Sequence, residues 1–344
     1  MSEPGTPLQP QAANQELRRR IMGYIVSQSI FTVNELRIAD RLGGEARSVT
    51  DLARECGVDA DALHRTLRLL AAEGLFHEGP TGSFRLAALG ELLRTEAPGS
   101  LHEFVNLMAG ESYRVWAESA YSVRTGKPAF DLVHGMPHFN WLAEHPDAAR
   151  DFNRAQASLV TQRSLPLLER NWQGVKTVVD VGGGNGQLLA TLLSQQPHLE
   201  GVLFDLPHVV TEAQAKLTES GVRDRTRIVG GDFFAEVPTG GDVYVLAQIL
   251  HDWNEEQALG ILRSCRKALP DHGRLLILEQ VIPEDDEPHP AKLLDLHMLV
   301  LLGGRERTET DWRSLLADSG FRLESVEQGA RSSLMTAVLD GAAR

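Results

Sequence analysis

The stretch Thr177-Val-Val-Asp-Val-Gly-Gly-Gly-Asn-Gly-Gln-Leu-Leu189 decides how the chain is organised. Apolar and β-branched residues lead into Asp180, a run of glycines follows, and leucines then recur at helical spacing. This order predicts a strand, a tight turn and a helix, which form the first βα unit of a doubly wound α/β sheet. Glycines suit such a turn because a bound cofactor has to approach bare backbone.

The spacing of these glycines separates three kinds of cofactor loop. A phosphate-binding P-loop needs a lysine and a serine or threonine after its last glycine, where this chain has Gln187 and Leu188. A dinucleotide loop needs its third glycine where Gln187 stands. The pattern that is present, Asp180-x-Gly182-x-Gly184-x-Gly186, resembles motif I of the S-adenosylmethionine (SAM) methyltransferases. A glycine turn that serves packing alone is the alternative.

The composition limits the class of protein. The 344 residues exceed one average domain and predict two. The net charge of −13 disfavours general binding to nucleic acid or to anionic membranes. The two cysteines, Cys56 and Cys265, provide neither a disulfide framework nor metal-ligand spacing. The sequence shows no signal peptide and no membrane-spanning apolar run, so we expect a cytoplasmic protein.

Residues 15–100 have the pattern of a winged helix, preceded by a disordered start at 1–14. An amphipathic helix is expected over 16–33, and a helix-turn-helix and a two-stranded wing follow it. Their expected landmarks are a helix cap at Thr50, a turn at Gly57, a second cap at Asp59, and strands at 73–76 and 83–86.

Two functions fit a winged helix. Arg65 and Arg68 on its second helix would suit a DNA-binding regulator. Packing and dimer contact is the favoured interpretation, because the chain is acidic and a long region with catalytic features follows.

Residues 101–170 are helical and rich in aromatic side chains and methionine, among them Met108 and Phe152. Core packing explains any one of them, but as a group they could wall an apolar pocket for a flat ligand. Residues 171–344 alternate strand and helix as a Rossmann-like domain does. Strands are expected at 177–181, 201–205, 226–229, 243–247, 274–279, 322–327 and 333–339.

Acidic residues follow two of these strands. Asp205 ends the second strand, where a carboxylate accepts hydrogen bonds from ribose hydroxyls in such folds. Asp232 follows the third strand, where it could meet an adenine amino group while Phe233 stacks beside the ring. An aspartate that only caps the next turn is the alternative for Asp232.

Candidate catalytic residues follow the next two strands. His251 stands just past the fourth strand, Glu279 ends the fifth, and Glu306 follows an apolar helix. A neutral histidine is the usual base near neutral pH, and a carboxylate on its other nitrogen fixes the tautomer and raises its basicity. The three could therefore form a base with two orienting acids. A helix-capping histidine with two solvated acids is the alternative, and spacing alone does not decide between them.

Five motifs in order resemble the plant-type small-molecule O-methyltransferases and their bacterial natural-product relatives. They are Val-Asp-Val-Gly-Gly-Gly-Asn-Gly at 179–186, Phe-Asp-Leu-Pro-His-Val at 204–209, Gly-Asp-Phe-Phe at 231–234, Leu-His-Asp-Trp at 250–253 and Gly-Gly-Arg-Glu-Arg-Thr at 303–308. The resemblance implies a winged-helix homodimerisation domain at 15–100 and a helical substrate region at 101–170. It also implies a Rossmann-like SAM domain at 171–344 with a mostly parallel seven-stranded sheet.

The resemblance further implies a metal-independent, SAM-dependent O-methyltransferase of secondary metabolism that releases S-adenosylhomocysteine. His251 would deprotonate a hydroxyl of an aromatic or polyketide-like acceptor, flanked by Glu279 and Glu306. The implied cofactor contacts are Asp180, Gly182, Gly184, Gly186, Asp205, Leu206, Gly231, Asp232, Phe233 and Gln248. The expected acceptor contacts are Met108, Phe152, Gln156 and Met298.

The chain departs from the family pattern in two places. Ala247 replaces a lysine that many members carry four residues before the catalytic histidine, and Gln248 could partly substitute for it. Gln156 replaces a common methionine and makes the acceptor pocket more polar. Relatives that bind SAM but catalyse decarboxylation, hydroxylation or cyclisation keep a non-methylating reaction as the second hypothesis. Methylation of nitrogen or carbon instead of oxygen is also left open.

Overall fold

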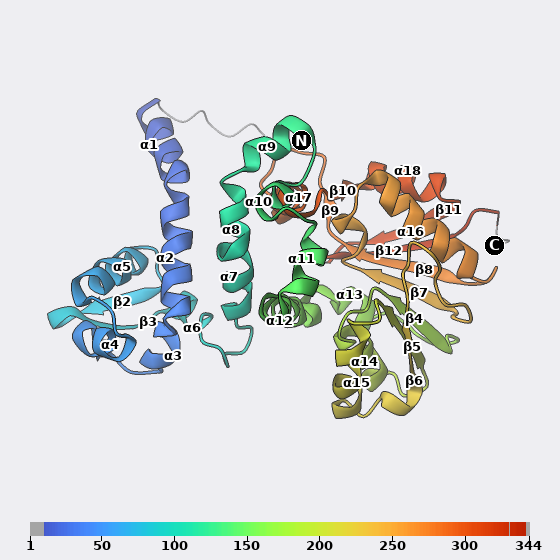
Figure 1. Ribbon diagram of the computed structural model, residues 1–344, viewed down its shortest axis with the longest axis horizontal. Helices are drawn as coiled ribbons and strands as arrows, with labels where there is room; N and C mark the ends of the chain where they lie inside the picture. The colour runs from blue at the N-terminus through green and yellow to red at the C-terminus, as the bar shows by residue number, and fades with distance from the viewer. Residues whose placement is uncertain (1–9, 330, 342–344) are drawn as a thin grey trace. The chain divides into compact units, whose positions relative to one another are not determined.

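The computed structural model describes residues 10–329 and 331–341, and its contacts divide the chain into two compact units, Met1–Arg114 and Val115–Arg344 (Figure 1). Part of the expected disordered start, residues 1–9, lies outside the described residues. Residues 10–14 belong to helix α1 (Pro10–Ile21), so the first helix begins earlier than the sequence predicted.

The single helix predicted over 16–33 is two helices in the first unit. α1 ends at Ile21 and α2 (Gly23–Glu35) begins after Met22. The break precedes Gly23, one of the poorest helix formers. A short helix, α3 (Ile38–Leu42), follows α2. A hydrophobic core that includes Leu52, Leu67 and Phe84 holds this unit together.

The winged helix is present with two local corrections. It consists of β1 (Arg47–Ser48), α4 (Val49–Cys56), α5 (Ala60–Ala72), β2 (Phe76–Gly79) and β3 (Ser83–Leu86), with strand order β1-β3-β2. Ser48, and not Thr50, caps α4: the Ser48 hydroxyl accepts a hydrogen bond from the Asp51 N–H. Asp59 caps α5 as predicted. The first wing strand begins at Phe76 because Gly74, at φ +80, turns the chain there. α6 (Ala88–Glu91) and α7 (His102–Ala109) complete the region.

Short helices precede the sheet of the second unit. They are α8 (Glu111–Trp116), which spans the boundary between the units, α9 (Ser119–Thr125), α10 (Ala129–His134), α11 (His138–Glu144), α12 (Pro146–Arg163) and α13 (Leu165–Leu168). α9 and α10 pack against the later helix α17 (Pro290–Leu302) around Phe130 and Val300. Among the described residues, no helix is both long and apolar enough to cross a membrane.

The predicted seven-stranded sheet is confirmed. Its order is β11-β12-β8-β7-β4-β5-β6, and β12 pairs antiparallel with both β8 and β11 while the remaining neighbours are parallel. The strands are β4 (Thr177–Val181), β5 (Glu200–Asp205), β6 (Thr226–Gly230), β7 (Val243–Ala247), β8 (Arg274–Glu279), β11 (Phe321–Glu327) and β12 (Ser333–Leu339). The predicted limits differ from these by one residue at most.

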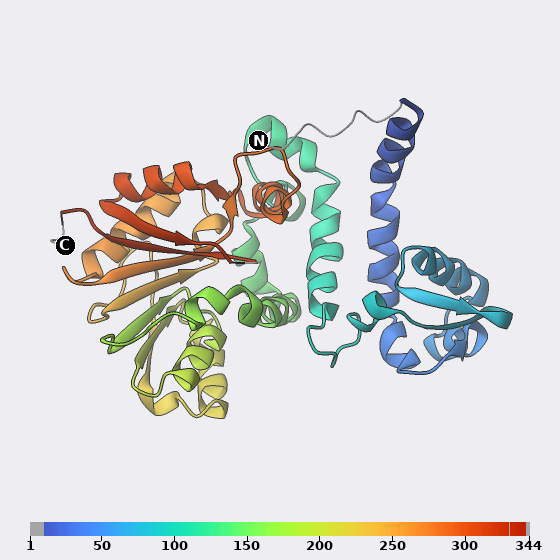
Figure 2. The same ribbon diagram turned by 180° about the vertical axis from the view of Figure 1, so that it is seen from behind.

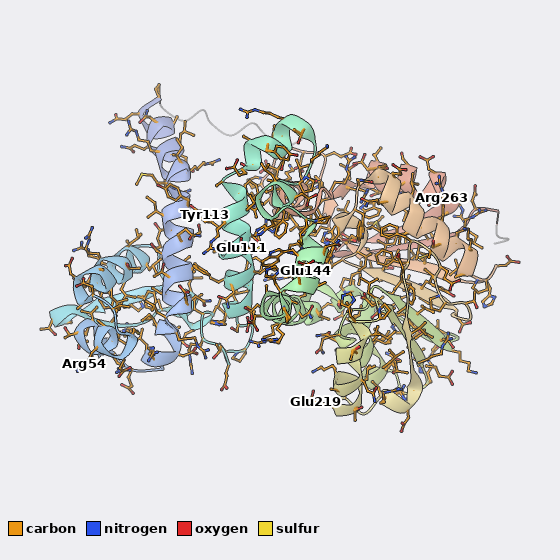
Figure 3. The ribbon with its side chains drawn as sticks, in the orientation of Figure 1. Arg54, Glu111, Tyr113, Glu144, Glu219 and Arg263 are labelled. Atoms are coloured by element: carbon orange, nitrogen blue, oxygen red, sulfur yellow. The ribbon has the colours of Figure 1, made fainter. Side chains whose placement is uncertain are left out.

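Helices cover both faces of this sheet (Figures 1 and 2). α14 (Gln187–Gln195) and α15 (Val210–Glu219) share a core with Leu203 on one face. α16 (Glu255–Ala268) and α18 (Glu309–Asp318) share a core with Ile277 on the other. Figure 3 labels Glu219 on α15 and Arg263 on α16, both of which are exposed. The central strands are apolar on both sides because both faces are covered.

The topology gathers the predicted site at one edge of the sheet. β4 and β7 are adjacent, and the order of strands reverses between them. Open α/β sheets bind ligands at such a switch point, beyond the carboxyl ends of the strands. The carboxyl ends of β4, β5, β6, β7 and β8 and the loops that follow them carry the glycine turn and every acid and histidine proposed from the second to the fifth strand.

Candidate active site

The three predicted catalytic residues lie together. His251 belongs to the single turn η3 (Leu250–Asp252) after β7, and its Nδ1 is 2.5 Å from Oε1 of Glu306 and 3.6 Å from Oε2 of Glu279. The residues are 5%, 2% and 0% exposed, respectively. Solvated acids, the alternative left open by the sequence, are therefore ruled out. Both carboxylates face the same ring nitrogen, which leaves Nε2 for another partner.

A short parallel pairing brings Glu306 to this position. Arg307 in β10 (Arg307–Thr308) pairs with Val281 in β9 (Val281–Ile282), just past the end of β8. The Arg305 N–H donates to the His251 carbonyl at 2.8 Å. At Gly304 a Cβ atom would lie 2.0 Å from that carbonyl oxygen, so only glycine allows the two segments to approach this closely.

Arg307 holds the turn that carries His251, and it is not among the residues predicted from the sequence. Its fully buried guanidinium donates to the Leu250 carbonyl at 2.9 Å and to the Trp253 carbonyl at 3.3 Å. It also pairs with Glu255 at 3.4 Å and lies 5.2 Å from the centre of the Trp312 ring. The only sequence signal was a second arginine in the motif at 303–308.

Glu279 is fixed by the backbone that follows β7. Its Oε1 accepts from the N–H groups of Ile249 and Leu250, both at 2.9 Å. Burial raises the pKa of Glu279 to about 7, although the nearby His251 opposes the shift. This carboxylate therefore has a defined orientation toward the histidine.

The acids make His251 a strong base. Burial alone would lower the pKa of His251, but the carboxylates of Glu279, Glu306 and Asp252 outweigh burial and raise it to about 10. Opposite charges in a buried site favour the protonated ring in this way. The imidazole therefore holds a proton far more tightly than an isolated one.

Asp252 is a further member of the site, and it is not among the residues predicted from the sequence. Its Oδ1 lies 3.3 Å from Nε2 of His251, on the side of the ring away from Glu306. Burial raises the pKa of Asp252 to about 6, and the charges of His251 and Arg163 oppose that shift. Its place beside His251 in the Leu-His-Asp-Trp motif was the available signal.

The glycine turn presents bare backbone. Gly182, Gly184 and Gly186 have φ values of 76°, 58° and 79°, a region that side chains disfavour. A Cβ atom at Gly182 would lie 2.5 Å from the Ile249 side chain, whereas one at Gly184 would meet nothing within 4 Å. The turn therefore leaves open space beside Gly184, where a ligand could contact the chain.

Two acids support the turn. Asp205 accepts from the Gly184 N–H at 2.8 Å and from the Leu206 N–H at 2.7 Å. Asp180 is buried, and its Oδ2 has no hydrogen-bond partner among the described residues. Burial, and then the charge of Asp205, raise the pKa of Asp180 to about 7. A buried acceptor of this kind is suited to a ligand that brings a donor or a positive charge.

The other predicted cofactor residues lie at the same edge of the sheet. Exposed Asp232 accepts from the Phe234 N–H at 2.9 Å, so it caps the turn, as the alternative interpretation held. Phe233 lies edge-on to Trp253 at 5.9 Å. At Gly231 a Cβ atom would lie 2.6 Å from the Phe204 ring, so this position requires glycine.

Gln248 points toward the catalytic acids. It has φ 58°, which is rare for a residue other than glycine and typical of functional sites. Its side-chain nitrogen donates to the Leu278 carbonyl at 2.9 Å and to Glu279 at 3.4 Å. Its Oε1 is buried without a partner among the described residues.

An aromatic series connects the predicted acceptor residues to the His251 turn. Phe152 on α12 lies edge-on to Phe139 at 6.4 Å, and Phe139 stacks on Trp253 at 5.9 Å. Gln156 lies one turn further along α12, and Met298 is buried on α17. Met108 belongs to α7 of the first unit, so its role as an acceptor contact remains a prediction.

His297, beside Met298, was not identified from the sequence. Its Nδ1 accepts a hydrogen bond from Nε1 of Trp116 at 3.1 Å. Burial, and then the charge of His251, lower the pKa of His297 to about 4. The ring is therefore neutral near pH 7 and carries its proton on Nε2.

The catalytic group also has the donor types of a metal site. Single ligand atoms of His251, Glu279 and Glu306 lie within 4.8 Å of one another. Glu279 already accepts two backbone N–H groups and Glu306 contacts Nδ1 of His251. The metal independence expected from the resemblance remains a prediction.

Comparisons with known proteins agree with this geometry. The family model of the O-methyltransferase domain matches residues 116–322, and that of the O-methyltransferase dimerisation domain matches residues 19–96. The phenazine O-methyltransferase PhzM of Lysobacter antibioticus is 45% identical over 311 residues, which cover 90% of this chain and 91% of that protein.

Two solved structures extend the comparison. The crystal structure of LaPhzM has a TM-score of 0.89 and 43% identity, and covers 95% of this chain and 99% of its own. NcsB1, an O-methyltransferase from neocarzinostatin biosynthesis, was solved with SAM and 2-hydroxy-5-methyl naphthoic acid. It has a TM-score of 0.81 and 29% identity, and covers 91% of this chain and 95% of its own.

Proposed function

The chain belongs to the SAM-dependent O-methyltransferase family, and we propose that it methylates a hydroxyl of an aromatic or polyketide-like natural product with His251 as the general base. The observation that carries the proposed role of His251 is its 2.5 Å contact, through Nδ1, with buried Glu306. That contact directs the other nitrogen of the ring toward the acceptor.

The residues present fit the cofactor. SAM, when bound, supplies an electrophilic methyl group on a positively charged sulfur. The open backbone at Gly184 suits a ligand that needs close approach, and the Oδ2 of buried Asp180, which has no partner in the described part of the chain, suits a cationic one. Asp205 would meet the ribose, and Phe233 would flank the adenine. Asp205 also orients the glycine turn through Gly184.

The elevated pKa of His251 matches a phenolic acceptor. A phenol has a pKa of about 10, and an ordinary imidazole has about 6.5, so proton transfer between them costs about 5 kcal/mol. The acids raise the pKa of His251 to about 10, which removes most of the cost of this transfer when the ring is in its free-base form. In the reaction, the acceptor O–H proton moves to Nε2, the acceptor oxygen bonds to the methyl carbon, and the carbon–sulfur bond breaks to leave S-adenosylhomocysteine.

The acceptor class and the assembly are parts of the same proposal. The aromatic series from Phe152 to Trp253 supports a flat acceptor. NcsB1 binds a hydroxynaphthoic acid.

The match to a dimerisation domain supports a homodimer built on the first unit. The two unpaired cysteines suit a reducing compartment and support a cytoplasmic location.

The experiment is incubation with methyl-labelled SAM and a panel of phenolic metabolites. We expect label to appear on an acceptor oxygen together with an equal amount of S-adenosylhomocysteine. Conversion of an acceptor without S-adenosylhomocysteine would support the non-methylating alternative. Salt-sensitive, sequence-selective DNA binding that requires Arg65 and Arg68 would support the regulator.

A further inference from the structure

Arg163 is a partly buried cation that the reaction described above does not use. It is the last residue of α12, and its Nη1 donates to Oε1 of Gln156 at 3.1 Å. Among the residues that the structure describes, no carboxylate forms an ion pair with it. A cation removed from water is costly unless a negative group accompanies it.

The catalytic acids compensate this charge only from a distance. Burial lowers the pKa of Arg163, while Glu279, Glu306 and Asp252 are near enough to oppose the shift. Those carboxylates already contact the backbone or His251. Arg307 also lies near the acids, but its guanidinium donates to three backbone carbonyls and pairs with Glu255.

A second cation adds to the positive potential at this point. Arg331, an exposed residue before β12, is near enough to disfavour the charge of Arg163. A second arginine near Arg163 makes this position more favourable for an anion than Arg163 alone would. Arg331 therefore offsets part of the negative potential that Glu279, Glu306 and Asp252 produce at the end of α12.

Arg163 shares one face of α12 with the predicted acceptor residues. At 3.6 residues per turn, Phe152, Gln156 and Arg163 fall within about 40° around the helix axis. Helical side chains lean toward the N-terminus, so the arginine reaches back to Gln156, as the hydrogen bond shows. The face runs from an aromatic ring through an amide to a cation. Figure 1 shows α12 next to α11 and α13, within the second unit.

We propose that Arg163, held by Gln156, binds a carboxylate on the acceptor, so that the enzyme selects hydroxyaryl carboxylates. This proposal rests on the proposed function, since it names the class of acceptor. The aryl ring lies along Phe152, the hydroxyl meets Nε2 of His251, and the carboxylate takes the N–H groups of the guanidinium that Gln156 leaves open. A guanidinium binds a carboxylate through two parallel hydrogen bonds, which orients the ring as well as holding it.

The test measures binding to the protein loaded with S-adenosylhomocysteine, by calorimetry, and needs no turnover. The probes are 4-hydroxybenzoate, 3-hydroxy-2-naphthoate and 6-hydroxyphenazine-1-carboxylate, each with its methyl ester. We expect the wild type to prefer at least one acid over its ester by 10-fold or more. In Arg163→Gln that ratio falls to near 1, which corresponds to a loss of about 10- to 100-fold for the acid.

Matched variants separate recognition from folding. Arg154→Gln removes another arginine of α12, which is exposed and 3.8 Å from Asp151, and should keep the wild-type ratio. Arg163→Lys keeps the positive charge but loses the two parallel N–H donors of the guanidinium, so it should recover part of the preference for the acid. Gln156→Glu would pair with Arg163 and abolish the preference. Melting curves establish that each variant is folded.

Three results would overturn the proposal. They are equal binding of acids and esters by the wild type, failure of every acid to bind, and an acid-to-ester ratio that Arg163→Gln leaves unchanged. Failure of the proposed function looks different, since no label would then reach any acceptor although an Arg163-dependent acid site could still be measured.

Discussion

Nδ1 of His251 and Oε1 of Glu306 lie 2.5 Å apart, at a point where both side chains are almost completely buried. A carboxylate at Nδ1 keeps a proton on that nitrogen, so Nε2, which lies 3.3 Å from Asp252, is the nitrogen that exchanges a proton with the acceptor. Glu279 lies 3.6 Å from the same Nδ1 and is itself held by two backbone N–H groups. The orientation of the base thus depends on two acids from different parts of the chain.

Glu306→Gln should lower kcat by about 100-fold, because an amide can donate to Nδ1 and so favours the unproductive tautomer. Affinity for SAM should change little. Single-turnover formation of S-adenosylhomocysteine measures the rate. Glu309→Gln, which breaks only an exposed pair with Arg313, is the control. A wild-type rate in Glu306→Gln would mean that this contact does not orient the base.

The value of kcat/KM should rise as the pH becomes more alkaline. The free base form of His251 becomes abundant only as the pH approaches its pKa of about 10. Glu279→Gln removes one carboxylate that stabilises the imidazolium, so the pKa falls and the rising limb should move to lower pH, with a lower plateau. A limb that stays in place would show that His251 is not the titrating group.

Gly182→Ala should weaken SAM binding by about 10-fold or more and leave the fold intact. The added Cβ atom lies 2.5 Å from Ile249, so the cofactor turn has to shift. Gly135→Ala is the matched control, since its φ of 75° is nearly the same and nothing lies within 4 Å of the new atom. Calorimetric titration with SAM compares them. Equal affinities in the two variants would place the cofactor elsewhere.

Arg307→Met should lower both stability and kcat. It removes the guanidinium donor from the Trp253 carbonyl and from the Leu250 carbonyl, which keeps only the Trp253 N–H at 3.4 Å, at a cost of about 1–3 kcal/mol. The His251 turn should loosen, while SAM affinity changes little. Denaturant unfolding and single-turnover rates provide the two readouts. A destabilised variant with unchanged kcat would show that Arg307 supports the fold but not the geometry of the base.

Much of the sheet could be predicted because its strands are short and apolar and most of them alternate with helices. The β4 strand and the turn after it are the clearest case, since Asp180 and its following glycines mark the strand end directly. Local choices between similar residues were not predictable. Ser48 and Thr50 can both cap a helix, and only the folded chain shows that Ser48 accepts the Asp51 N–H.

The residues of the candidate active site also fall into those that the sequence predicted and those that it did not. His251 follows a strand and Glu279 ends the adjacent one, so their meeting could be expected from topology alone. Arg307, Asp252 and Arg163 could not be assigned, because their roles depend on tertiary contacts without a periodic signal. The pairing that places Glu306 and Arg307 involves strands of only two residues each.

The most direct test of the account is single-turnover methyl transfer by His251→Ala, saturated with labelled SAM and given an acceptor that the wild type methylates. The account predicts a rate lower by about 100-fold or more, with SAM affinity nearly unchanged. Transfer at the wild-type rate would contradict the assignment of His251 as the base.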